Sequence, residues 1–196
     1  MKRIVFVVSV CLCWLMVNFS SVDASAVRIA DVGVYNFVQE IRSVVHDMNR
    51  EMINIAPYNI NDAVRATYLD KNYAGYIGYT SKILEKGTNK QKAVIRFYAN
   101  GQGYLSRANI MISDFEDSQA IGMIFGAMMI SLGVGQDEYM QFYKRFWNKI
   151  QTAKESGNDD IKVRDSIYCK AKKRYFDLYF YKCTKDHPHI DINGRV

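Results

Sequence analysis

The sequence has little of what the common catalytic sites require. Its 196 residues include three histidines and four cysteines. It contains no Gly-x-Ser-x-Gly, no His-Glu-x-x-His, no phosphate-binding loop and no glycine-rich dinucleotide turn. His46, the histidine outside the C-terminal tail, lies on the polar flank of an expected helix, where a solvated side chain is the ordinary outcome. The sequence therefore gives no reason to assign an enzymatic activity, a catalytic residue, a cofactor or a metal.

The chain also lacks a strong charge of one sign and, beyond its N-terminus, a long apolar run. The sequence has 26 basic and 20 acidic side chains, and without Lys2, Arg3 and Asp23 of the N-terminal segment the totals are 24 and 19. This moderate excess is not typical of a nucleic-acid-binding protein, so we expect no nucleic acid partner. No run in the rest of the chain is long enough for a transmembrane helix.

The N-terminus has the three parts of a signal peptide. Lys2 and Arg3 precede an apolar run from Ile4 to Val17, and a polar stretch ends in Ala24-Ser25-Ala26. This pattern predicts a signal peptide over residues 1–26, cleaved after Ala26, and an extracytoplasmic protein, either periplasmic or secreted. An uncleaved signal anchor is the alternative. Residues 27–185 then have the length of a single domain.

Export would leave two cysteines, Cys169 and Cys183. Two cysteines in an oxidising compartment tend to pair, and we predict a disulfide between them. The hairpin geometry opposes this prediction. If the chain turns at Lys173-Arg174, Cys169 faces Leu178, five residues from Cys183, which is too far for a disulfide unless the turn lies elsewhere.

Apolar periodicity predicts three helices. Valine, isoleucine and phenylalanine recur at three- and four-residue steps from Val34 to Met52, and an aromatic stripe follows the same spacing over Asp137–Lys154. Between them, Ala120–Val134 carries no charge and is apolar all round, which predicts a buried helix. Gly122 and Gly126 share one face of it and would let another backbone come close.

Strand-like segments predict an antiparallel sheet. Tyr76–Leu84, Lys92–Ala99 and Tyr104–Ile112 are rich in β-branched and aromatic residues and read as a meander, with Asn100-Gly101 as a type I′ turn. A hairpin follows, from Ile161 and over Tyr175–Cys183. We therefore expect an α+β domain with a largely antiparallel five-stranded sheet, a meander of three plus a C-terminal hairpin, with three helices covering one face, one of them buried.

The polar C-terminus, residues 186–196, is expected to be a flexible tail. His187-Pro188-His189, with Asp186 and Asp191, offers imidazole and carboxylate groups that bind zinc or copper in other proteins. A flexible tail gives them no fixed geometry, so no metal site is predicted.

The last hairpin mixes cationic and aromatic side chains. Such a mixture holds phosphates or stacks on sugar rings, although a solvated sheet face has much the same composition. The candidate ligand-binding residues are Lys162, Arg164, Tyr168, Lys170, Lys172, Arg174 and Tyr179. Because the protein is expected to be exported, the candidate partners are an anionic envelope polymer, a lipid headgroup or a partner protein.

Two function classes are left. The first is an exported accessory or binding module with an aromatic and basic sheet face. The second is a small enzyme or ligand carrier with a pocket between the sheet and the helix at Ala120–Val134. A packed interior would favour the first class, and an enclosed pocket lined by titratable groups would favour the second.

Overall fold

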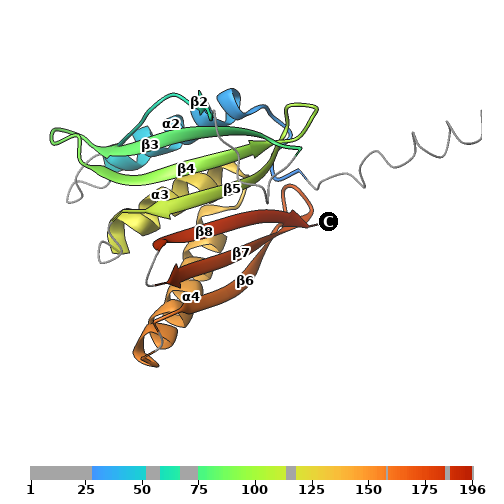
Figure 1. Ribbon diagram of the computed structural model, residues 1–196. Helices are drawn as coiled ribbons and strands as arrows, with labels where there is room; N and C mark the ends of the chain where they lie inside the picture. Colours follow the sequence, from blue (N-terminus) through green and yellow to red (C-terminus); the bar gives the residue numbers. More distant parts are fainter. Residues whose placement is uncertain are drawn as a thin grey trace, which may run out of the picture.

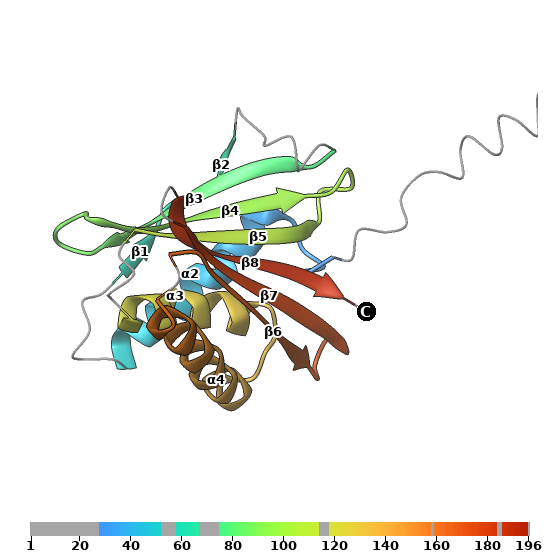
Figure 2. The ribbon, with the colours of Figure 1, turned by 60° about the horizontal axis from the view of Figure 1, so that its bottom comes forward.

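The computed structural model describes residues 28–51, 58–66, 75–113, 118–157, 159–183 and 186–195. The predicted signal peptide, residues 1–26, lies outside them, so its cleavage stays a prediction. The three predicted helices are present as α2 (Val34–Glu51), α3 (Ser118–Ser131) and α4 (Gln136–Glu155). All three lie on one side of the sheet (Figure 2). No helix of the described chain is both long and apolar enough to cross a membrane.

One antiparallel sheet contains all the strands of the described residues. Its order is β1-β3-β4-β5-β8-β7-β6, with the short β2 also pairing with β3 (Figure 1). The α+β class is confirmed, whereas the count of five strands was too low. The bounds are β1 Tyr58–Ile60, β2 Val64–Arg65, β3 Ile77–Glu85, β4 Gln91–Ala99, β5 Leu105–Ile112, β6 Ile161–Cys169, β7 Arg174–Cys183 and β8 Asp186–Arg195.

The prediction of a flexible C-terminal tail is wrong. Residues 186–195 form β8, which lies between β5 and β7 and pairs with both. Ile190 and Ile192 are buried, while Asp191 and Asn193 point to the opposite face. This strand joins the meander β3–β5 to the meander β6–β8, so the polar end of the chain completes the sheet (Figure 1).

The predicted disulfide is also wrong. The hairpin turns over residues 170–173, with Lys173 at φ 50°, and Cys169 pairs with Arg174. Cys183 therefore lies nine residues along β7 from that pair, roughly 30 Å at about 3.3 Å per residue, whereas bridged Cα atoms lie within about 7 Å. Cys169 is buried instead, and its thiol donates to the carbonyl oxygen of Gly133 at 3.2 Å.

The helix α3 is buried as predicted, and its C-terminus is a Schellman motif. The Val134 amide donates to Met129 O at 3.1 Å and the Gly133 amide donates to Ile130 O at 2.8 Å, with Gly133 at φ 89°. Glycine suits this position because a left-handed backbone costs it little. The turn ends α3 and lets α4 begin at Gln136.

Gly122 and Gly126 accommodate aromatic rings, not the second backbone that was expected. A Cβ at Gly126 would lie 2.8 Å from Cε1 of Tyr139, and one at Gly122 would lie 3.0 Å from Cε1 of Tyr143. The Tyr139 hydroxyl donates to Gly122 O at 2.6 Å. The aromatic stripe of α4 is thus a packing face against α3.

The loop between β4 and β5 is not a type I′ turn at Asn100-Gly101. The Asn100 side-chain oxygen accepts hydrogen bonds from the amides of Gln102 and Tyr104, both at 3.0 Å. Gly103, at φ 84°, takes the left-handed conformation. The asparagine side chain therefore organises a longer loop, which an Asn-Gly pair alone does not predict.

Candidate functional site

The three described helices, α2, α3 and α4, leave one face of the sheet uncovered (Figure 2). We call this the open face. Directly paired residues of neighbouring strands point to the same face, so the register identifies its members. One row runs across six strands through Thr80, Arg96, Asn109, Asp191, Tyr179 and Arg164.

Four of the seven predicted ligand-binding residues lie on the open face, namely Lys162, Arg164, Tyr168 and Tyr179. Sequence reasoning missed several neighbours that complete the site. Tyr175, Asp177 and Tyr181 lie at two-residue steps from Tyr179 along β7 and share its face. This alternation is visible in the sequence. The polar composition of residues 186–196 predicts a tail and so does not identify the members that β8 contributes, which are His189, Asp191, Asn193 and Arg195.

Lys170, Lys172 and Arg174 lie elsewhere. Lys170 forms an ion pair with Glu138 at 2.8 Å, and this hydrogen bond lowers the pKa of Glu138 and raises the pKa of Lys170. The carbons of Lys172 pack beside Gly133.

Arg174 fastens the start of the described chain to the sheet. It donates to the carbonyl oxygen of Arg28 and lies 3.5 Å from Asp31. The three residues therefore hold the turn and the segment before α2 in place.

Aromatic rings gather on the β6–β8 part of the open face. The rings of Tyr179 and Tyr181 are stacked at 6.4 Å with an interplanar angle of 8°, and Tyr181 stacks on His189 at 5.3 Å. Tyr168 and Tyr175 lie 4.9 Å apart and are 42% and 41% exposed. The open face thus presents ring surfaces to solvent.

Cations surround these rings. The register places six cationic side chains of the described strands on the open face: Lys82, Arg96, Arg107, Lys162, Arg164 and Arg195. Their acidic counterparts there are Asp177 and Asp191. Asp191 accepts a hydrogen bond from Asn109 at 2.6 Å, and Asp177 lies within 3.5 Å of both Arg164 and Arg195. Six cations against two acids give the face a net positive charge, and both carboxylates are already bound by side chains of this face.

Tyr181 of the open face is expected to be neutral at physiological pH. Partial burial, and then the nearby charge of Asp191, raise the pKa of Tyr181 above the ordinary value for tyrosine. Its hydroxyl can therefore donate a hydrogen bond to a ligand as well as accept one.

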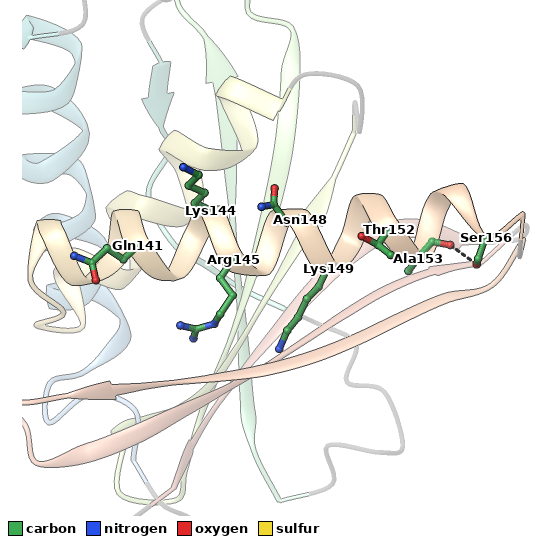
Figure 3. Close-up of a pocket in the computed structure, with 8 residues that line it drawn as sticks. All are labelled: Gln141, Lys144, Arg145, Asn148, Lys149, Thr152, Ala153 and Ser156. Atoms are coloured by element: carbon green, nitrogen blue, oxygen red, sulfur yellow. Dashed lines mark hydrogen bonds between the residues drawn. The ribbon is translucent and has the colours of Figure 1, made fainter.

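A second basic surface lies along α4, where a shallow groove of about 760 Å³ is lined by polar side chains and Ala153 (Figure 3). Arg145 and Lys149 both bond Asp165 of β6 at 3.0 Å. Burial alone would raise the pKa of Asp165, but the hydrogen bonds from Arg145 and Lys149 outweigh it and the pKa is lowered. These cations tie α4 to β6, and the described residues place no aromatic ring in the lining of this groove.

The cleft between α2 and β1, of about 730 Å³, contains His46. His46 is exposed and lies 3.4 Å from Asp47. Two of the other polar side chains bind the backbone of β1: Arg42 donates to Ile60 O at 2.8 Å, and the Asn49 amide bonds both the amide and the carbonyl of Tyr58. These groups replace a neighbouring strand along β1.

The interior between α3 and the sheet holds a cavity of about 10 Å³. It is lined by Lys92 and otherwise by apolar side chains of β4, β5, α3 and β8. A volume of this size holds a single water molecule at most. This is where a ligand carrier of the second function class would need its pocket.

In the described part of the chain, no three histidine, cysteine or acidic side chains come together as metal ligands would. No protein-family model matches this sequence, and neither a curated protein nor a solved structure matches it.

Proposed function

We propose that this protein is an exported binding module of the cell envelope and that its open face binds an anionic polysaccharide. The observation that carries the proposal is the combination on this face of stacked tyrosine rings with six cationic side chains and two acids that are already partnered. Rings stack on the flat faces of sugars, and guanidinium groups pair with carboxylates or phosphates.

The shape of the site supports a polymer as the ligand. Small molecules bind in concave pockets, whereas the open face extends over six paired strands. A polymer carries repeated charges and repeated rings. It can therefore contact Arg96 and Arg164 while its sugar rings contact the tyrosines of β6 and β7. The predicted signal peptide supports an envelope polysaccharide over a nucleic acid.

The alternative function of ligand carrier or small enzyme has less support. It requires a pocket between the sheet and α3, and the cavity there is about 10 Å³. Lys92 is the titratable residue that lines it, and it lies 3.9 Å from Glu85. We therefore favour the binding module.

Calorimetric titration of residues 27–196 with three polymers tests the proposal. Polygalacturonate offers sugar rings with carboxylates, dextran offers rings without charge, and polyglutamate offers carboxylates without rings. We expect polygalacturonate to bind at least about tenfold more tightly than the other two, because both stacking and ion pairing contribute. Equal binding of polyglutamate would instead indicate an acidic protein partner, and no binding of polygalacturonate would refute the proposal.

A pair of variants tests the ring contacts. Removing the stacked rings with Tyr179→Ala and Tyr181→Ala should weaken polygalacturonate binding by about tenfold, the effect expected for loss of one good stacking contact. Tyr35→Ala is the matched control, because Tyr35 is an exposed tyrosine on α2, away from the open face. A similar loss in the control would show that the effect is not specific to this face.

A further inference from the structure

Asp177 holds two arginines together on the open face. Its Oδ2 lies 3.5 Å from Nη2 of Arg164 on β6 and 3.2 Å from Nε of Arg195 on β8. Because both nitrogens contact the same oxygen, the two guanidinium groups lie close together although they come from strands on opposite sides of β7. We call this arrangement the arginine bridge.

Tyrosine rings fix the orientation of both guanidinium groups. Arg164 lies over the ring of Tyr179 at 5.1 Å, and Arg195 lies over the ring of Tyr175 at 4.9 Å. These tyrosines stand two residues to either side of Asp177 on β7, so each arginine is held by one ring and by the shared carboxylate. The side chains are therefore positioned before a ligand arrives, which reduces the entropy lost on binding.

The arginine bridge has donors left over. The side chain of Asp177 is only 9% exposed, whereas those of Arg164 and Arg195 are 61% and 54% exposed. Each guanidinium has five N–H donors, and Asp177 uses a minority of them. Two positive charges against one negative charge leave the bridge with a net charge of +1.

We infer that the arginine bridge is a preformed site for one monoanionic oxyanion on a sugar ring, such as the carboxylate of a uronic acid. One such group neutralises the remaining charge, takes N–H donors from both arginines, and places its sugar ring beside Tyr175 or Tyr179. The inference rests on the proposed function, because it locates the charged group of the same polysaccharide. Arg164 and Arg195 bind the ligand, and Asp177 is a positioning residue.

Substitutions that keep the charge separate a built site from diffuse attraction. The double variant Arg164→Lys with Arg195→Lys retains both positive charges and loses the planar, stacked forks. We expect it to bind polygalacturonate about tenfold more weakly, the equivalent of one charge-assisted hydrogen bond. Arg50→Lys, at an exposed arginine of α2 away from the open face, should change binding less than about twofold. Equal affinities for parent and double variant would overturn the inference.

Asp177→Asn distinguishes the arginine bridge from diffuse attraction, because the two predict opposite changes in the affinity for polygalacturonate. The variant makes the open face more positive, so diffuse attraction predicts tighter binding. Loss of the arginine bridge predicts weaker binding, and Asp177→Glu should restore part of the affinity. Thermal melts of each variant check that the fold is intact. Tighter binding by Asp177→Asn would refute the positioning role.

A measurement on a small anion keeps this inference distinct from the proposed function. Nuclear magnetic resonance of the arginine Nε–Hε groups can be followed while inorganic phosphate at mildly acidic pH, where the monoanion dominates, is added. Saturable shifts at Arg164 and Arg195, larger than at Arg96, would support the site even if polygalacturonate did not bind. Equal, unsaturable shifts at all three would overturn the site even if the polymer bound elsewhere on the open face.

Discussion

Gly126→Ala tests whether α3 and α4 pack as tightly as the structure indicates. The added Cβ would lie 2.8 Å from Cε1 and 3.2 Å from Cζ of Tyr139, closer than a real Cβ approaches. The Tyr139 ring has little room to move, because the ring centroids of Phe125 and Tyr143 lie 5.6 and 5.7 Å from its own. Moving it would break the hydrogen bond from its hydroxyl to Gly122 O, which is 2.6 Å long.

The expected cost of Gly126→Ala combines three effects of known size. Overpacking costs about 1–3 kcal/mol, and a lost buried hydrogen bond costs about 1–3 kcal/mol. Alanine returns about 1 kcal/mol, because glycine is a poor helix former. The net loss is about 3 kcal/mol, or roughly 6–12 °C in the melting temperature of a domain of this size.

Urea unfolding and thermal melting of the parent and the variant measure this loss. Gly101→Ala is the control, since nothing lies within 4 Å of its Cβ and its φ is not in the left-handed region; it should change stability by less than about 0.5 kcal/mol. Tyr139→Phe combined with Gly126→Ala should cost less than the sum of the two single changes, because both remove the same hydrogen bond. A Gly126→Ala protein as stable as the parent would refute the close packing of α3 on α4.

Three further predictions follow from the pKa shifts and the N-terminus. Burial raises the pKa of Tyr139 and Tyr143 above the value of 10.0 for an exposed tyrosine, so the folded protein keeps these protons to higher pH than the unfolded chain. The free energy of unfolding should therefore keep its full value below about pH 10. Above that pH it should fall by about 1.4 kcal/mol per pH unit for each tyrosine. Urea titrations should show a shallower alkaline loss for Tyr139→Phe with Tyr143→Phe, and an equal slope would contradict this. Asp165→Asn should cost about 1 kcal/mol at pH 7, a small value because Arg145 and Lys149 are about half exposed. The parent should lose the same contribution to stability as pH falls below about 4, since the pKa of Asp165 is lowered in the folded state. Asp47→Asn, at an exposed carboxylate, is the control. Equal stability of the two variants would contradict a stabilising role for the ion pairs of Asp165. N-terminal sequencing of the protein from its native host should begin at Val27, and a first residue of Met1 would refute cleavage.

Periodicity in the sequence predicted the helices and strands that are long enough to show a repeating apolar pattern. The helices α2 and α4 have an apolar stripe, α3 is apolar all round, and β3, β4 and β5 have the composition of strands. The strands β1 and β2 are three and two residues long, too short to show any period. Asn49 and Arg42 of α2 bind the backbone of β1 and hold it beside the helix, whereas β2 is placed by its pairing with β3.

The sequence alone could identify about half of the residues of the open face. Lys162, Arg164, Tyr168 and Tyr179 lie on a hairpin whose alternation is visible in the chain. Arg195 and Asp191 come from β8, whose mixture of isoleucine with charged residues resembles a solvated tail. The sequence could not place Arg195 beside Asp177, since that neighbour relation exists only through the pairing of β7 with β8.

The sequence by itself determined where the helices and the long strands lie and which side of each is apolar. The tertiary structure decided which strands are neighbours, that the last ten described residues form a central strand, and that Cys169 and Cys183 are far apart. The physical reason is that every strand offers the same backbone hydrogen-bonding groups, so alternation specifies a face without specifying a partner. Insertion of β8 between β5 and β7 buries Ile190 and Ile192, and this long-range packing assembles the arginine bridge.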